Sequence, residues 1–433
     1  MSKKMCYNFY NMKTYAMMVL GCKVNDYEAA FVEQELNKDY RKVSFNEVAD
    51  IYLIFTCAVT NVAESKSRKF IRQAKRLNPN AYIVAIGCYV QTSPNEEVFE
   101  NIDLLIGSQE KNKIKEYIDE GLKKNTIKHL DKPQFEEMIV HEYARKGRAF
   151  LKIQDGCNQF CSYCIIPYAR GRERSADHNH VIEEARELSL HSKEIVLTGI
   201  HTGRYFDGEY HLIDLLKELV KIDTLKPIRL SSIEITEIHD DLIELMANNP
   251  KIARHLHIPL QSGSTKVLKD MHRPYDVEYF LKRIAEIRNK IPGISISTDL
   301  IAGFPGESDE NHKETLNTLE KAQFSFIHLF PYARKKGTLA DNRDDFVDSR
   351  IVEKRINEIN ELELKYKTAY KDSRLNTITK VFIERNLNGI SYGYSSEYLR
   401  VEIEGSYPAG ILLEVRIIAT DPFVKGEVIN VIE

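Results

Sequence analysis

Three cysteines in the middle of the chain have a spacing that suits a metal cluster. Cys157, Cys161 and Cys164 lie in the segment DGCNQFCSYCIIPYARGRERS with the pattern C-x3-C-x2-C, and Tyr163 directly precedes the third cysteine. Three thiolates on one tight loop can bind three irons of a cubane cluster and leave the fourth iron open to a substrate molecule. A structural zinc site is the alternative, but zinc prefers four closed ligands, and no fourth cysteine or histidine follows at the usual spacing.

Three further cysteines share one position relative to strand-like segments. Cys22 follows VLG, Cys57 follows IFT and Cys88 follows AIG, and each of these runs is apolar. The carboxyl ends of parallel strands meet at one edge of a sheet, which is where open α/β folds bind their ligands. The three thiols are therefore expected to form one ligand set, because three unrelated core cysteines would not all follow a strand terminus.

The elements that position both trios are predicted from alternating strand and helix patterns. In the first part of the chain, strands are expected at 15–21, 51–56, 82–87 and 103–107, with helices from residue 25 and over 61–77. This alternation indicates an open parallel sheet with helices on its faces. Residues 121–147 are polar and weakly patterned, which is typical of an interdomain connection.

The alternation resumes after residue 148. Six strands are expected, at 149–154, 194–199, 228–233, 255–260, 294–303 and 324–330. Six βα units indicate a partial barrel, two units short of the common eight, with its active face at the carboxyl ends of the strands. A long helix is expected over 348–371, and the tail from about 372 has the turn-rich alternation of a small antiparallel barrel.

Length and composition agree with this division. A chain of 433 residues suggests about three domains. It has no apolar stretch near the roughly 18–20 residues of a membrane span and no signal-peptide layout, so a cytoplasmic location is expected. Thiols stay reduced there, and seven cysteines then point to metal binding rather than disulfides. The net charge of −3 gives no global nucleic-acid signal, so a polyanion site must be a local patch.

The cysteine loop with its aromatic residue resembles the motif of the radical S-adenosylmethionine (SAM) superfamily. In that superfamily the methionine part of SAM chelates the open iron, and reductive cleavage releases a 5′-deoxyadenosyl radical. With both trios, nearly the whole chain resembles the methylthiotransferase family. The matching segments are LGCKVNDYE, FTCAVTNVAESKSR, GCYVQTSP, LTGIHTGRY, RLSSIE, HLHIPLQSGS, STDLIAGFPGE and HLFPYARKKGT.

The resemblance implies three domains and two cofactor sites. A flavodoxin-like methylthiotransferase domain is expected at 12–125, a radical SAM domain with a partial (β/α)6 barrel at 143–370, and a TRAM-like RNA-binding barrel at 371–433. One 4Fe-4S cluster would bind SAM at the C-x3-C-x2-C trio. An auxiliary 4Fe-4S cluster, again with an open iron, would be held by Cys22, Cys57 and Cys88 and carry the sulfur. No catalytic residue beyond these cluster ligands is predicted.

The resemblance also indicates the reaction. Lys23–Val24 and LTGIHTGRY favour the branch that methylthiolates C2 of N6-threonylcarbamoyladenosine at position 37 of tRNA, with SAM as both methyl donor and radical source. The expected partners are this tRNA, an electron donor of flavodoxin or ferredoxin type and a sulfide source, with no membrane. The alternatives are the isopentenyladenosine branch, the ribosomal-protein branch, whose first motif differs from LGCKVN, and a non-enzymatic iron–sulfur or zinc protein that binds RNA.

Contacts to SAM and to RNA are predicted less directly. By the resemblance, Tyr163, Thr198, Gly199, Gln261 and Asp299 would face SAM. Basic residues offered for phosphate binding are Lys66, Arg68, Lys69, Arg72, Lys75, Arg76, Arg170, Arg172, Arg174, Arg334, Lys335 and Lys336. The tail is slightly acidic, so base stacking by residues such as Tyr392, Tyr394 or Tyr398 is expected to assist. Two departures from the family are Phe55, where asparagine is usual, and an N-terminal extension that contains Cys6.

Overall fold

The structure, a computed structural model, describes residues 12–127, 130, 132–143, 148–192, 194–225 and 227–432, so Cys6 lies outside the described part. The chain forms two compact units. The first comprises residues 1–140 with 154–159 and 164–176, and the second comprises 141–153, 160–163 and 177–433. The first unit therefore includes two segments that the chain supplies only after it has begun the second.

The first unit is built on a parallel sheet of six strands. Its strand order is β2-β1-β3-β4-β5-β6, and every neighbouring pair is parallel. The strands are β1 (Thr14–Val19), β2 (Arg41–Lys42), β3 (Ile51–Thr56), β4 (Tyr82–Gly87), β5 (Leu104–Ile106) and β6 (Lys124–Asn125). The predicted open parallel sheet is confirmed. The two edge strands were not predicted, because they have two polar residues each and no apolar run.

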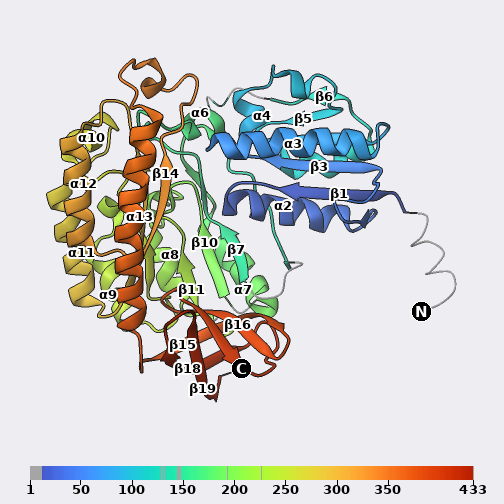
Figure 1. Ribbon diagram of the computed structural model, residues 1–433. Coiled ribbons are helices and arrows are strands. Elements are labelled where there is room, and N and C mark those ends of the chain that lie inside the picture. The colour runs from blue at the N-terminus through green and yellow to red at the C-terminus, as the bar shows by residue number, and fades with distance from the viewer. Residues whose placement is uncertain are drawn as a thin grey trace. The chain divides into compact units, whose positions relative to one another are not determined.

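Helices cover both faces of this sheet (Figure 1). They are α2 (Lys23–Leu36), α3 (Asn61–Leu77), α4 (Cys88–Thr92) and α5 (Ile114–Asp119), with 3-10 turns at Glu97–Phe99 and Lys111–Lys113. One apolar core packs α3 and α4 against the sheet, and the other packs α2 and α5 against its opposite face. All six residues of β3 are buried, as expected for a central parallel strand covered on both sides.

The late segments of the first unit form a short hairpin and a helix. They are β8 (Gln154–Asp155), α6 (Ile166–Arg170) and β9 (Arg174–Ser175), and β8 pairs with β9 in antiparallel fashion. Ile165 and Ala169 belong to the core cluster that contains α3, and Ser108 donates a hydrogen bond to the carbonyl of Ala169. Residues 164–176 are thus packed into the core that the first 140 residues form.

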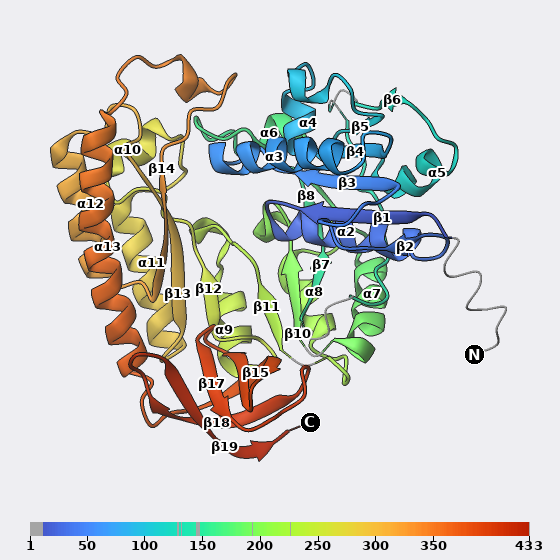
Figure 2. The same cartoon turned by 45° about the vertical axis from the view of Figure 1, so that its right-hand side comes forward.

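The second unit contains the predicted six-stranded partial barrel. One sheet has the order β11-β10-β7 and the other β12-β13-β14, and a parallel bridge between Ser232 and His257 joins them. Figure 2 shows β12, β13 and β14 side by side. The strands are β7 (Arg148–Lys152), β10 (Glu194–Thr198), β11 (Ile228–Leu230), β12 (His255–His257), β13 (Ser295–Ala302) and β14 (Phe326–Pro331).

Helices alternate with these strands, as the sequence predicts. They are α7 (His178–His191), α8 (Leu212–Leu219), α9 (Asp240–Asn248), α10 (Thr265–Asp270), α11 (Val277–Lys290), α12 (Asp309–Ala322) and the long α13 (Ser349–Asp372), with 3-10 turns at Thr202–Arg204, Ile235–Glu237 and Leu339–Asn342. Among the helices of the described residues, none has both the length and the apolar character required to cross a bilayer.

The C-terminal part of the second unit is a closed barrel of five strands with the order β15-β16-β17-β19-β18. The strands are β15 (Ile378–Leu387), β16 (Ile390–Ser395), β17 (Arg400–Glu404), β18 (Leu412–Ala419) and β19 (Val424–Val431). The turn-rich pattern of the tail predicted an antiparallel barrel. This prediction is wrong for one pair of strands, because β17 and β19 are parallel. Five strands cannot alternate in direction around a closed ring, so one parallel pair is unavoidable.

A buried ion-pair group attaches this small barrel to the partial barrel. Glu194, which is 1% exposed, accepts hydrogen bonds from both Arg148 and Arg229. Arg229 also donates to the carbonyl oxygens of Ser395 (3.1 Å) and Ser396 (3.1 Å) at the end of β16. Burial alone would raise the pKa of Glu194, but the two arginines hold it below its usual value.

Replacing Arg229 with methionine is expected to lower the free energy of unfolding of the second unit by about 3 kcal/mol. The substitution leaves Glu194 with one cation and removes the hydrogen-bond donor of two backbone carbonyls. Urea denaturation at neutral pH measures this loss. The control is Arg350→Met, whose side chain is 90% exposed and whose removal should change stability by less than about 0.5 kcal/mol. Because the pKa of Glu194 is lowered by folding, the difference between wild type and Arg229→Met should shrink below about pH 4. Equal losses in both variants would contradict the expectation.

Candidate iron–sulfur centres

The first cysteine trio lies at the carboxyl edge of three adjacent strands. Cys22 follows β1 and caps the N-terminus of α2, Cys57 follows β3 directly, and Cys88 is the first residue of α4 after β4. These strands are neighbours in the sheet, so the common edge expected from the sequence is where the structure places all three. All three are free thiols, Cys57 and Cys88 being buried and Cys22 exposed.

Glycines before two of these cysteines permit the close approach. Gly21 has φ of +101°, and a Cβ there would lie 2.9 Å from the Sγ of Cys57. Gly87 has φ of +104°, and a Cβ there would lie 3.0 Å from the carbonyl oxygen of Thr56. Both conformations favour glycine, and both turns bring the following cysteine close to the end of β3.

The side chain of Asn25 fixes the ends of β1 and β3 next to the cysteines. Its amide nitrogen donates to the carbonyl oxygens of Leu20 (2.7 Å) and Thr56 (3.0 Å). Phe55 is wholly buried and belongs to the apolar core on the α2 face of the sheet. The residue that replaces the usual asparagine therefore serves packing, and polar support at this edge comes from Asn25.

The thiols influence one another, and this favours a shared metal group. Burial raises the pKa of the Cys57 thiol to about 12, with further increases from Cys88 and Cys22, while Arg170 lowers it. A metal cluster relieves such crowding, because coordination replaces the protons on the thiols. The described residues contain two groups of three potential ligands within 4.8 Å of one another, and neither includes a cysteine. Three thiols also leave a tetrahedral zinc one ligand short, whereas they match the three-cysteine ligation of a cluster with one open iron.

The second trio lies on the loop after β8. The N–H of Cys157 donates to the carbonyl of Gly171 (3.1 Å), which closes the loop on itself. Cys161 is 9% exposed, and its sulfur accepts a hydrogen bond from the guanidinium of Arg273 (3.3 Å). Arg273 also pairs with Glu234. Burial opposes the charge of Arg273, but Glu234 and nearby groups keep its pKa above the usual value. Arg273 was not predicted from the sequence, because its partners Cys161 and Glu234 lie far from it along the chain.

The predicted SAM contacts fall on three different parts of the partial barrel. Thr198 is the buried last residue of β10, and Gly199 follows it. Gln261 pairs with Leu300 in a parallel bridge beside Asp299, and its N–H donates to the carbonyl of Asp299 (2.9 Å). Tyr163 packs edge-on against Phe304, with ring centroids 6.3 Å apart. Of the predicted set, therefore, Gln261 and Asp299 are brought together directly.

Two histidines that the sequence reasoning missed accompany Asp299. His257 forms an ion pair with Asp299 (3.2 Å) and contacts Ser297 through its other ring nitrogen (2.9 Å). His328 on β14 completes a group of three potential ligands. The alternating His-Leu-His of β12 was the available signal, because residues two apart share one face of a strand.

Several arginines and lysines predicted to contact RNA are occupied elsewhere. Arg170 is fully buried and Arg174 forms an internal ion pair, so the prediction that ARGRERS presents them to phosphates is wrong for these two. Lys335 is buried and Arg334 pairs with Asp341. The predicted basic residues that remain exposed are Lys66, Lys69, Arg72 and Arg76 on α3, together with Arg172, Lys336 and the paired Arg334. On α3, Arg68 instead donates to the hydroxyl of Tyr89 (2.7 Å), and Lys75 is half-buried.

The three tyrosines proposed for base stacking differ in their surroundings. Tyr398 stacks on His255 (4.9 Å between ring centroids) and on Tyr394 (4.8 Å), so both rings serve the packing between the two barrels. Tyr392 is different. Its ring lies between the guanidiniums of Arg385 (5.1 Å) and Arg400 (5.3 Å), both of which are exposed.

Comparisons with known proteins agree with these features. A model of the radical SAM superfamily matches residues 151–319, and a model described as uncharacterized protein family UPF0004 matches residues 14–107. The structure of the radical S-adenosylmethionine methyltransferase TsrM from Kitasatospora setae shares the fold, with a TM-score of 0.56 at 14% identity over 76% of this chain and 77% of that one.

Relatives similar along their whole length were also found. The threonylcarbamoyladenosine tRNA methylthiotransferase MtaB of Bacillus subtilis (strain 168) is 39% identical over 98% of this chain and 98% of its own. A tRNA-2-methylthio-N(6)-dimethylallyladenosine synthase of Thermoanaerobacter sp. (strain X514) is 32% identical over 98% of this chain and 93% of its own.

The partial barrel and its cysteine loop thus define a radical SAM enzyme. The chain belongs to the radical SAM methylthiotransferase family, which uses SAM and 4Fe-4S clusters. Membership sets aside the non-enzymatic alternative, and the MtaB relative from Bacillus subtilis, at 39% identity, is more similar to the chain than the dimethylallyladenosine synthase from Thermoanaerobacter, at 32%.

Proposed function

We propose that this enzyme methylthiolates C2 of N6-threonylcarbamoyladenosine at position 37 of tRNA and forms 2-methylthio-N6-threonylcarbamoyladenosine. The observation that carries the proposal is the presence of two cysteine trios in a chain 39% identical to MtaB of Bacillus subtilis over almost its full length. C2 of adenine bears an unactivated hydrogen, and this explains why a radical cofactor is required.

The two trios divide the work. Cys157, Cys161 and Cys164 would hold the SAM-binding cluster, and Cys22, Cys57 and Cys88 would hold the auxiliary cluster. When bound, the first cluster with SAM supplies the radical, and the second supplies the sulfur that SAM also methylates. The chain places one set of thiols at a sheet edge, where Cys57 and Cys88 are buried, and supports the other set through Arg273. Tyr163, Thr198, Gly199, Gln261 and Asp299 would orient SAM.

The proposed domains follow the same division: 12–125 for the auxiliary cluster, 143–370 for SAM and 371–433 for RNA. An electron donor of flavodoxin or ferredoxin type and a sulfide source would complete the reaction. A cytoplasmic location suits free thiols and a tRNA substrate.

Nucleoside mass spectrometry tests the substrate. The chain is expressed in a bacterium that lacks its own methylthiotransferases, and nucleosides from purified tRNA are measured. The proposal expects 2-methylthio-N6-threonylcarbamoyladenosine with the wild type and none with Cys161→Ala. Appearance of the isopentenyl analogue instead would show that the branch is wrong, and unchanged tRNA from a protein with both clusters loaded would show that the substrate is wrong.

The C-terminal barrel offers a specific surface for the tRNA. Arg385, Tyr392 and Arg400 lie on adjacent strands, so two cations flank a ring that can stack on an unpaired base. This local group gives an otherwise slightly acidic barrel a site for a polyanion.

The double variant Arg385→Gln/Arg400→Gln is expected to weaken tRNA binding about tenfold and to reduce the slope of log affinity against log salt by about 2. Fluorescence anisotropy with labelled tRNA at several salt concentrations measures both. Arg416→Gln is the control, because Arg416 is also exposed but lies on β18. If the control and the double variant lose the same affinity, this surface is not the one that binds.

A further inference from the structure

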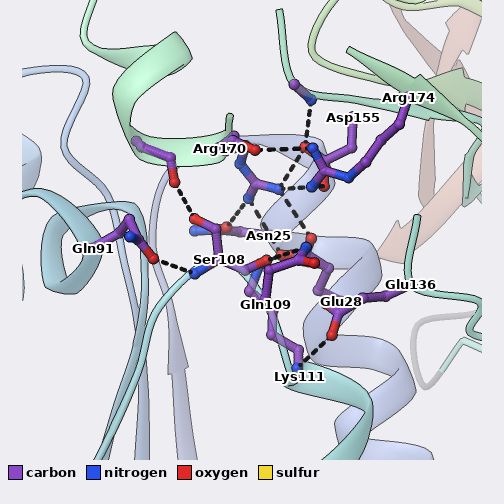
Figure 3. A network of polar contacts seen from close by, with 12 residues as sticks. Asn25, Glu28, Gln91, Ser108, Gln109, Lys111, Glu136, Asp155, Arg170 and Arg174 are labelled. Atoms are coloured by element: carbon purple, nitrogen blue, oxygen red, sulfur yellow. Dashed lines mark hydrogen bonds and ion pairs between the residues drawn. The ribbon is translucent and has the colours of Figure 1, made fainter. Parts of the chain in front are cut away.

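A charged network is buried inside the first unit (Figure 3). Its centre is Arg170, the last residue of α6, whose side chain is completely buried. The guanidinium donates to Glu28 (3.0 Å), to Asp155 (3.2 Å) and to the side-chain oxygen of Asn25 (2.9 Å). The same Glu28 receives a second buried cation, Lys111, at 2.7 Å. Such a group is costly to bury unless every charge is paired, and here two cations and two carboxylates compensate one another.

The network connects the loops of the two cysteine trios. Asn25 and Glu28 follow Cys22 on α2, whereas Asp155 precedes Cys157 and Arg170 follows Cys164. These four residues and Lys111 all belong to the first unit. The radical SAM loop thus provides a cation whose partners stand on the helix that begins at the auxiliary site.

Arg170 is also connected to the strand ends that carry the cysteines. Asn25, which accepts a hydrogen bond from Arg170 (2.9 Å), donates to the carbonyls of Leu20 (2.7 Å) and Thr56 (3.0 Å), which lie two residues before Cys22 and directly before Cys57. The Nε–H of Arg170 is buried and has no acceptor among the residues that the structure describes. A buried donor without an acceptor is rare in folded proteins, and a sulfur of a cluster at Cys22, Cys57 and Cys88 would satisfy it.

We infer that Arg170 is a positioning residue of the auxiliary cluster, where its fixed charge and free Nε–H favour the more negative, reduced state and so raise the reduction potential. The inference rests on the proposed assignment of Cys22, Cys57 and Cys88 as cluster ligands. Net charge and hydrogen bonds to the sulfurs are the factors by which a protein sets such a potential. Glu28 acts in the opposite direction, because its carboxylate disfavours added negative charge.

The test uses the full chain with Cys157, Cys161 and Cys164 replaced by alanine, so that only the auxiliary cluster remains. Its midpoint potential is measured by dithionite titration followed by electron paramagnetic resonance. Arg170→Gln is expected to lower the potential by an amount equivalent to a tenfold change in the ratio of reduced to oxidised cluster, about 59 mV for one electron. Glu28→Gln is expected to raise it, and Arg170→Lys to restore most of the loss.

Both glutamine variants break the same buried ion pair, so damage to the fold should shift the midpoint potential in the same direction in both. An effect of charge should shift it in opposite directions. The matched control is Arg174→Gln, which removes an arginine that also pairs with Asp155 (3.0 Å) and should shift the potential less than Arg170→Gln. Shifts of the same sign, or no shift, in Arg170→Gln and Glu28→Gln would overturn the inference. If Arg170→Gln does not fold, a higher midpoint potential in Glu28→Gln supports the inference, and any other result for Glu28→Gln overturns the inference. A parent protein that binds no iron at Cys22, Cys57 and Cys88 would instead overturn the ligand assignment.

Discussion

Replacing Cys161 with alanine is expected to abolish reductive cleavage of SAM. Two thiolates cannot hold three irons of a cubane, so bound iron should fall from about eight to about four per chain. Substitution of a residue that only supports a metal ligand costs about 10–100-fold, and loss of a ligand should cost more. Release of 5′-deoxyadenosine under dithionite, measured by liquid chromatography, should therefore fall more than about a hundredfold.

The environment of Cys161 makes this variant informative. Its sulfur is the acceptor for the buried Arg273, so alanine also removes a contact of that guanidinium. Arg273 retains Glu234 as a partner, and the fold should persist. Cys6→Ala, which removes a cysteine outside both trios, is the control and should keep both iron and activity. A Cys161→Ala protein that still binds eight irons and releases 5′-deoxyadenosine would refute the assignment of this trio.

Replacing Cys57 with alanine is expected to separate the two halves of the reaction. Cys57 lies at the sheet edge of the first unit, away from the C-x3-C-x2-C loop along the chain, and its loss should leave the SAM-binding cluster intact. Iron should again fall to about four per chain. SAM cleavage should continue, while the yield of 2-methylthio nucleoside should drop below detection, because no sulfur donor remains.

Measuring both products in one reaction makes the comparison direct. Cys22→Ala and Cys88→Ala should reproduce the behaviour of Cys57→Ala if the three residues hold one cluster. Since a buried free cysteine packs as a small apolar side chain, alanine should be tolerated at Cys57. Full methylthio product from Cys57→Ala would show that the enzyme does not need the auxiliary cluster.

Local patterns were sufficient to predict the strands and the placement of the cysteines. Each of Cys22, Cys57 and Cys88 follows an apolar run that forms a strand, and strand ends are properties of short segments. The six strands of the partial barrel were predicted for the same reason, although the predicted runs were longer than several of the strands.

Features that depend on distant partners were not predictable in this way. Arg170 belongs to a basic run that is typical of a protein surface. It is buried because it pairs with Asp155 and with Glu28, which lies 142 residues earlier in the chain. Tyr398 was expected to face RNA, but its ring contacts Arg229 and His255 of the partial barrel. The sequence shows that such residues are charged or aromatic, and only the fold decides what they meet.

The first unit is built from separate segments of the chain, and this determines when it can finish folding during synthesis. Its core needs α6, and Glu28 needs Arg170, yet both are made after residue 153, when the ribosome has already begun the partial barrel. At typical elongation rates the stretch from 127 to 176 takes about 2–10 s. During that interval the nascent sheet has an open core and Glu28 lacks one of its two cations. A chimera that exchanges the first unit between relatives should therefore carry residues 154–159 and 164–176 together with residues 12–140, because α6 and Arg170 complete its core and its buried ion pairs.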